Sequence, residues 1–318
     1  MKIMKKTLNT FFSLLSRLVF KNTAYIPQEI DACITFYEAG DYKRAIEAGL
    51  LAVEKYPENP AAYYYLGLAY FAVGILKFAY ENMKKAARLT NNKEDLMNIY
   101  DQLGLISKKM GYLDDALIYF GRSLRLARDL GNTDMQAVIL NSIANICTDK
   151  GEFDRALRYY KEALRLTTNV EEKAIIYRNI ANMYYKKGDY QEAIEYLQKA
   201  IEIDEKYGNY HDASIDKLIL GDTYREMKDY ENAEKYLFEG LEGVEKVGDE
   251  LWEATGYWFL GWLYEDKGDE KTAIKYYTRA YNLFKSIGAE RDAQNVLDDI
   301  NRLIPVRWRG FPDDDIPF

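Results

Sequence analysis

Side chains suited to catalysis or metal binding are scarce in this 318-residue sequence, which has one histidine and two cysteines. Cys33 and Cys147 are too far apart to form a C-x-x-C zinc or redox motif. His211 is the only candidate imidazole base or ligand, and its position between two helical patterns predicts a solvated residue at a helix start. The sequence also has no P-loop, no G-x-G-x-x-G motif after a strand and no H-E-x-x-H motif. We therefore expect no catalytic residues, no metal site, no cofactor and no enzyme activity.

Composition and charge narrow the range of partners. Hydrophobic residues make up 48% of the chain, which is enough for a packed core rather than disorder. The net charge of −8 argues against direct binding of nucleic acid, because affinity for phosphates needs a basic face. No stretch approaches 18 uninterrupted apolar residues, so we expect no membrane span and a cytoplasmic protein.

The start of the chain has the opposite charge. Residues 1–28 contain basic but no acidic side chains, and their apolar residues recur at helical spacing. We expect residues 1–25 to form a basic amphipathic helix that packs on the neighbouring fold or on a partner. A cleaved signal peptide and a helix lying on the inner membrane surface are the alternatives.

A turn followed by an alanine recurs seven times along the chain. The alanines are separated by steps of 34, 37, 40, 37, 40 and 40 residues: Ala45, Ala79, Ala116, Ala156, Ala193, Ala233 and Ala273. Self-similarity at such a period indicates one repeat array, although the length alone would suggest two globular domains. Extra residues in a helical repeat must come in near-whole turns. The longer steps therefore predict one additional turn in one or both helices of a repeat.

Other residue types also recur within each repeat. The second repeat reads Y-x2-L-G-x2-Y from Tyr63 to Tyr70, and the last repeats this pattern from Tyr257 to Tyr264. Residues 26–288 resemble the tetratricopeptide repeat family in its long-helix form, with repeats of 37–40 residues. The resemblance implies an all-α, right-handed superhelical solenoid of seven antiparallel helix pairs. A final helical pattern predicts a C-terminal capping helix at 289–304, and an acidic tail follows at 305–318.

Smaller features specify how the helices pack and end. One small residue in each of six first helices is expected to let the paired helix approach closely: Gly67, Gly104, Ala144, Ala181, Gly221 and Gly261. Gly188 suits a left-handed helix end, and Asp189 with Glu192 predicts a capping box. Both cysteines fall at repeat positions that predict buried thiols.

In the tetratricopeptide family, the first helix of each pair lines a concave groove that binds extended peptides or helices. Alignment of the early repeats assigns Tyr64, Leu68 and Phe71 to this groove, followed by Asp101. The candidate peptide-binding residues are Asn141, Asn145, Arg178, Asn179, Asn182, Tyr185, Asp222, Arg225, Trp258 and Trp262.

Each kind of candidate suggests a different contact. The resemblance implies that Asn145 and Asn182, at equivalent positions, hold the backbone of a bound peptide, since a carboxamide both donates and accepts. Arg178 and Arg225 could bind a ligand carboxylate in bidentate fashion. The two tryptophans lie four residues apart and are either an aromatic anchor or packing under the capping helix. The alternative for the polar residues is an ordinary solvated surface.

The end of the chain offers a second candidate site. Its last six residues are similar to the acidic tip of bacterial single-stranded DNA-binding proteins: Asp313, Asp314, Asp315, Ile316, Pro317 and Phe318. Those tips dock on replication and repair enzymes, so the resemblance implies docking and not DNA binding. The alternatives are a solvated tail, or a tail that occupies the groove of its own chain or of a second copy.

Together these features predict a scaffold or adaptor that binds an extended segment of a partner protein in its concave groove. The alternatives are a peptide-responsive regulatory protein and an adaptor that docks through its C-terminal tail. Self-association through the tail and membrane contact through residues 1–25 are further expectations.

Overall fold

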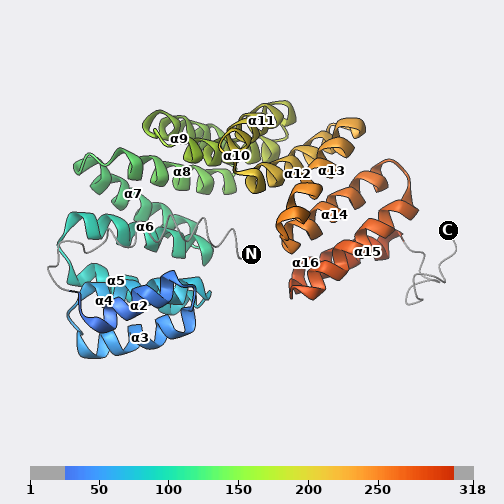
Figure 1. Ribbon diagram of the computed structural model, residues 1–318. Helices are drawn as coiled ribbons and strands as arrows, with labels where there is room; N and C mark the ends of the chain where they lie inside the picture. The colour runs from blue at the N-terminus through green and yellow to red at the C-terminus, as the bar shows by residue number, and fades with distance from the viewer. Residues whose placement is uncertain (1–25, 304–318) are drawn as a thin grey trace. The chain divides into compact units, whose positions relative to one another are not determined.

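The computed structural model describes residues 26–303 of the chain, and every regular element in this range is an α-helix (Figure 1). The expected N-terminal helix (1–25) and the expected acidic tail (305–318) lie outside the described residues. The prediction of an all-α fold is confirmed within residues 26–303.

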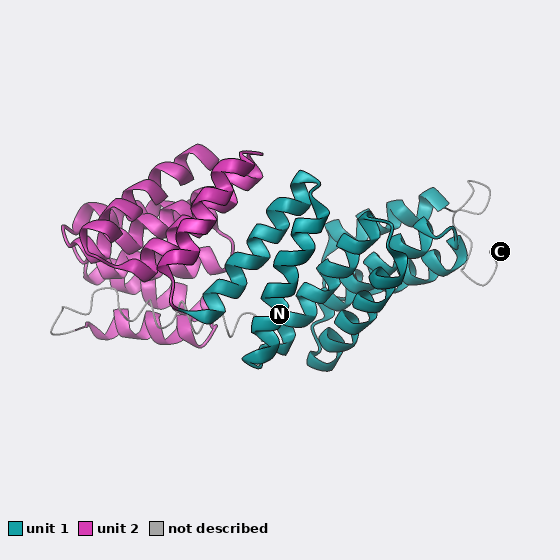
Figure 2. Ribbon diagram, turned by 90° about the horizontal axis from the view of Figure 1, so that it is seen from above, with its two compact units in different colours: residues 1, 169–318 teal, residues 2–168 magenta. Residues whose placement is uncertain are grey.

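The helices follow one another as antiparallel pairs, and consecutive helices pack together within each unit. Residues 26–168 form the described part of unit 2, with helices α2 (Gln28–Glu38), α3 (Tyr42–Lys55), α4 (Pro60–Ala72), α5 (Leu76–Leu89), α6 (Lys93–Lys109), α7 (Leu113–Asp129), α8 (Thr133–Asp149) and α9 (Phe153–Leu166). Residues 169–303 form the described part of unit 1, with helices α10 (Val170–Lys187), α11 (Tyr190–Lys206), α12 (Tyr210–Glu226), α13 (Tyr230–Val247), α14 (Glu250–Asp266), α15 (Glu270–Ser286) and α16 (Glu290–Leu303). The seven expected pairs and the final helix are therefore present in residues 26–303. Figure 2 shows the two units in different colours.

The helix lengths explain the repeat steps. In the step of 34 residues, α3 has 14 residues and α4 has 13. In the first step of 40, α7 and α8 have 17 residues each, which is about one turn more per helix. All seven repeat alanines are fully buried. The prediction that the longer repeats add near-whole turns is confirmed.

Close approach of the paired helices depends on the predicted small residues. A Cβ atom on Gly104 of α6 would lie 2.7 Å from the ring of Phe120 on α7, which is itself completely buried. A Cβ atom on Gly261 of α14 would lie 2.2 Å from the ring of Tyr277 on α15. Because no side chain fits at these positions, an aromatic ring of the second helix packs directly on the backbone of the first.

The turn between α10 and α11 has the predicted left-handed helix end but not the predicted capping box. Gly188 ends α10 with a left-handed φ of 88°, as expected. Asp189 precedes α11 but its side chain accepts no hydrogen bond from the first turn of that helix. The carboxylate binds the Lys187 ammonium instead, so the expected capping box with Glu192 was wrong.

Two glycines of one helix pair test the close-approach account. We expect Gly104→Ala to lower the free energy of unfolding by about 1–3 kcal/mol, because the added methyl group meets the Phe120 ring. Gly121 on α7 is exposed, with no atom within 4 Å of the added Cβ, so Gly121→Ala should instead stabilise by about 0.5–1 kcal/mol. Urea unfolding followed by circular dichroism measures both changes. Equal effects of the two substitutions would contradict the account.

Candidate functional site

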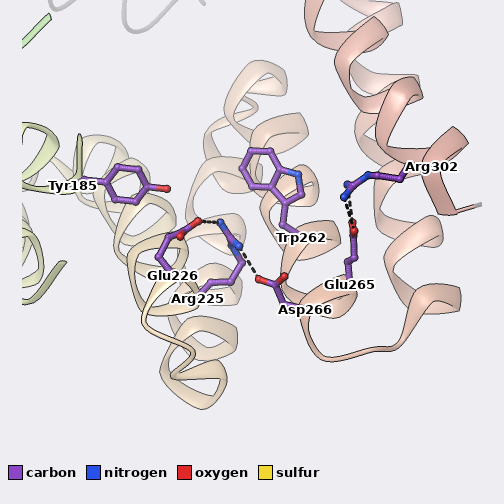
Figure 3. A pocket seen from close by; sticks show the side chains of 7 residues that line it. All are labelled: Tyr185, Arg225, Glu226, Trp262, Glu265, Asp266 and Arg302. Atoms are coloured by element: carbon purple, nitrogen blue, oxygen red, sulfur yellow. Dashed lines mark hydrogen bonds and ion pairs between the residues drawn. The ribbon is translucent and has the colours of Figure 1, made fainter. Parts of the chain in front are cut away.

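A cavity of about 370 Å³ lies in unit 1, on the first helices of successive pairs (Figure 3). The first helices of the three pairs in unit 1 and the last helix, α16, supply its lining residues: Tyr185 from α10, Arg225 and Glu226 from α12, Trp262, Glu265 and Asp266 from α14, and Arg302 from α16. Its volume is at the lower end of the range for ligand pockets in proteins. Three of the predicted groove residues, Tyr185, Arg225 and Trp262, therefore lie around one cavity.

Three carboxylates hold Arg225 in the cavity wall. Its Nε donates to Asp222 Oδ1 at 2.8 Å, and its Nη1 donates to Asp266 Oδ2 at 2.7 Å. Nη2 binds Glu226, and the guanidinium carbon lies 5.5 Å from the centre of the Trp262 ring. Burial alone would lower the pKa of Arg225, but the neighbouring carboxylates outweigh burial and raise it. The guanidinium is thus a cation that already has its counter-ions.

Tyr185 joins α10 to the same network. Its hydroxyl donates to Asp222 Oδ2 at 2.8 Å, so the two oxygens of this carboxylate bind Tyr185 and Arg225. Burial raises the pKa of Asp222, while the Arg225 guanidinium acts in the opposite direction. Burial and the Asp222 carboxylate also raise the pKa of the Tyr185 hydroxyl well above its usual range. Asp222 is therefore an internal partner of the wall rather than a free ligand-binding group.

The two tryptophans pack against the last helix. Both indole N–H groups donate to Asp299 Oδ2 on α16, from Trp258 at 2.8 Å and from Trp262 at 3.1 Å. Trp258 also packs edge-to-face on Phe284, with ring centroids 6.0 Å apart. Of the two alternatives for this pair, packing under the last helix describes Trp258, whereas Trp262 additionally lines the cavity.

Arg302 lines the cavity from α16. Its two terminal nitrogens donate to the two Glu265 oxygens at 2.8 and 3.1 Å, and it also contacts Asp299 at 3.0 Å. Its side chain is 56% exposed. The Tyr277 hydroxyl donates to Glu265 as well, at 2.6 Å, which fixes this carboxylate between α15 and α16.

Arg178 lies on α10 and is paired with two buried carboxylates. Its Nη2 donates to Asp204 Oδ2 on α11 at 2.9 Å, and its Nε binds Asp216 on α12. Burial raises the pKa of Asp216 to about 6, although Arg178 acts against this shift. Arg178 therefore connects three consecutive helices of unit 1.

The predicted asparagines fall in both units. Asn141 and Asn145 lie on α8 in unit 2, where the Tyr160 hydroxyl donates to Asn145 Oδ1 at 2.6 Å. Asn179 and Asn182 lie on α10 in unit 1. Asn182 is exposed and shares one helical face with Arg178 and Tyr185, because the three residues are four and three positions apart.

The early positions assigned to the groove are mostly buried. Tyr64 and Leu68 on α4 are 3% and 4% exposed, and Asp101 on α6 is 6% exposed. Burial raises the pKa of Asp101 to about 7. Phe71 is partly exposed. These side chains belong to the packed interior of unit 2, since α4 packs against α2, α3 and α5.

The two cysteines and the histidine, which are the candidates for catalysis or metal binding, are held inside the folded structure. Cys33 and Cys147 are buried free thiols, as expected. His211 is not solvated, because its Nε2 lies 2.9 Å from Asp249 Oδ2 at the start of α14. Within residues 26–303, no cluster of metal-ligating side chains occurs, and no helix is long and apolar enough to cross a membrane.

Sequence reasoning missed four lining residues: Glu226, Glu265, Asp266 and Arg302. Helical periodicity carries a signal for two of them, since Glu265 and Asp266 follow Trp262 by three and four positions on α14. Arg302 reaches the cavity only through the packing of α16, which the repeat pattern does not specify. The tail candidates Asp313–Phe318 lie outside the described residues.

Comparison with known families identifies the repeat. A tetratricopeptide repeat model matches residues 95–169, 172–237 and 213–286, and a second tetratricopeptide repeat model matches residues 32–79. No curated protein matches the sequence.

Solved structures share the fold at low sequence identity. A STAND signal-transduction ATPase with a tetratricopeptide repeat sensor, from Pyrococcus horikoshii, is 21% identical with a TM-score of 0.68, covering 84% of this chain and 44% of the ATPase. The APC/C hetero-tetramer Cut9-Hcn1 gives 16% identity and a TM-score of 0.64, covering 93% of this chain and 53% of that one. A Rap protein complexed with Competence and Sporulation Factor gives 15% identity and a TM-score of 0.60, covering 88% and 87%. This chain thus spans about half the length of the first two proteins.

The buried ion pairs of Arg178 lead to a stability prediction. We expect Arg178→Met to lower the free energy of unfolding by about 3–5 kcal/mol at pH 7, because Asp204 and Asp216 would remain buried without their counter-ion. The double variant Arg178→Met/Asp216→Asn should recover part of this loss.

The pH dependence of the same variant follows from the direction of the pKa shift. A carboxyl group whose pKa is raised on folding is stabilised in the folded state below its unfolded pKa, and this stability is lost as the pH rises through the folded pKa. The deficit of Arg178→Met should therefore shrink as the pH falls from 8 to 5. Urea unfolding at these two pH values measures it, and a single variant as stable as the wild type would show that the pairs contribute nothing.

Proposed function

The chain belongs to the tetratricopeptide repeat family, and on that premise we propose that it is a non-enzymatic interaction scaffold. The proposed ligand is an extended segment of a partner protein, bound on the first helices of unit 1 at the cavity between Tyr185 and Trp262. The single observation that carries the proposal is the convergence of α10, α12, α14 and α16 on this cavity.

The surface around the cavity supports this proposal. Asn182 is exposed on α10 one turn before Tyr185, so its carboxamide is available to pair with the backbone of a bound segment. Trp262 and Tyr185 supply aromatic walls, which are common anchors in protein interfaces. Both features belong to unit 1 and need no contribution from the other unit.

A regulatory role that responds to a bound factor is the second candidate. The similarity to a Rap protein solved with Competence and Sporulation Factor favours it, although the identity of 15% supports only a shared fold. Such a role would use the same surface, with the additional requirement that ligand binding changes the conformation of the chain.

Site-specific photo-crosslinking tests the scaffold proposal. The full chain would carry p-benzoylphenylalanine in place of Asn182, and a matched control would carry it in place of Glu202, an exposed residue on the outer helix α11. In extracts of the source cells, we expect a partner that crosslinks from position 182 and not from 202, with the crosslink mapped by mass spectrometry to an extended segment.

The outcomes separate the groove from the tail. The same crosslinked proteins from both positions, or none from position 182, would contradict binding at this face. A partner that is captured by the intact chain but lost after deletion of Phe318, with no crosslink from 182, would assign the function to the C-terminal tail.

A further inference from the structure

We infer that the cavity of unit 1 binds a cationic side chain, a guanidinium or ammonium group, of the partner segment. The inference rests on the proposed function and specifies the chemistry of its ligand. It reverses the expectation from the sequence that Arg225 receives a ligand carboxylate.

The first step is that Arg225 is not available to an anionic ligand. Its side chain is 13% exposed, and each of its three nitrogens binds a different carboxylate, from Asp222, Glu226 and Asp266. A ligand carboxylate would have to displace one of these and leave it in the wall without its counter-ion, which is costly in a partly buried site.

The second step is the charge of the site. Glu226, Glu265 and Asp266 line the cavity together with two guanidinium groups. Asp222 and Asp299 do not line the cavity themselves, but they bind its lining side chains. The lining and the groups bound to it therefore contain five carboxylates and two guanidinium groups, an excess of three negative charges that favours a cation.

The third step is that some of this negative charge is accessible. The side chains of Asp266 and Glu226 are 39% and 31% exposed. Within residues 26–303, Asp266 accepts a hydrogen bond from Arg225 at Oδ2. Its other oxygen, Oδ1, can accept a hydrogen bond from a guanidinium or ammonium group without breaking that pair.

The fourth step is the aromatic wall. Figure 3 shows Trp262 between the Arg225–Asp266 pair and the Arg302–Glu265 pair, with Tyr185 across the cavity. Electron-rich ring faces attract cations, and Trp262 already attracts one, because the Arg225 guanidinium lies 5.5 Å from its ring centre. Phe259 also stacks on this ring, with centroids 5.4 Å apart, so the carboxylates and the Tyr185 ring are the groups left to attract a ligand cation. The cavity of about 370 Å³ has room for one long side chain and part of its backbone.

Matched peptides test this inference with the full chain. The probes are three blocked nonapeptides of alternating serine and alanine that differ only at the central residue, which is arginine, citrulline or glutamate. Citrulline has the shape of arginine without its charge. Binding is followed by the NMR signals of the indole N–H groups, with the Trp262 signal assigned by a Trp262→Phe variant.

We expect the arginine peptide to bind at least about fivefold more tightly than the citrulline peptide, and the glutamate peptide to bind most weakly. Added salt should weaken the arginine peptide more than the citrulline peptide. Asp266→Asn should remove most of the preference for arginine. Glu202→Gln, which changes the net charge equally on the outer helix α11, should leave it intact.

Each other outcome has a definite reading. Equal affinities, a preference for glutamate or no response to the arginine peptide would overturn the inference, while the crosslinks from position 182 decide the proposed function separately. The tail at 305–318 contains two arginines, Arg307 and Arg309. If the arginine peptide bound only after Arg307→Gln and Arg309→Gln, the cavity would be occupied by the tail of this chain, and its assignment to a partner would be overturned.

Discussion

The close approach of the two helices in each pair is the constraint on which the rest of the structure depends. A Cβ atom on Gly261 would lie 2.2 Å from the ring of Tyr277, so the second helix packs on the backbone of the first at this position. A neighbouring pair can then pack beside it, as α12 and α14 do. The cavity of unit 1 is built on these first helices, so the position of its lining residues follows from the packing of each pair.

The same arrangement determines which charges remain available for a ligand. Neighbouring first helices are close enough for Arg225 on α12 to reach Asp266 on α14, and for Arg178 on α10 to reach Asp216 on α12. Both arginines thereby connect successive repeats, and carboxylates of the protein neutralise their positive charge. The sequence predicted that Arg178 and Arg225 bind a ligand carboxylate. In the structure, the cavity of unit 1 instead has an excess of negative charge around the indole ring of Trp262.

The recurring residues and their resemblance to the tetratricopeptide repeat were sufficient to predict the helix pairs, and the repeat period predicted the added turns, because a helical turn has a fixed length. The resemblance to the tetratricopeptide repeat also placed Tyr185, Arg225 and Trp262 on first helices, and the three line one cavity. It could not predict the ion pairs that join different helices, because Asp204, Asp216 and Asp266 lie 26 to 41 residues away from their arginines. Arg302 was missed for a related reason, since it reaches the cavity through the packing of α16 on α15.

The central claim is that a ligand occupies the first-helix face of unit 1, and hydroxyl-radical footprinting of the full chain with saturating arginine peptide tests it most directly. Oxidation of Tyr185 and Trp262 should fall severalfold on binding, because both side chains line the cavity. Tyr207 and Tyr210, which are 52% and 67% exposed near the turn between α11 and α12, should keep their oxidation rates. Protection of Tyr207 and Tyr210 with unchanged oxidation of Tyr185 and Trp262 would contradict the account.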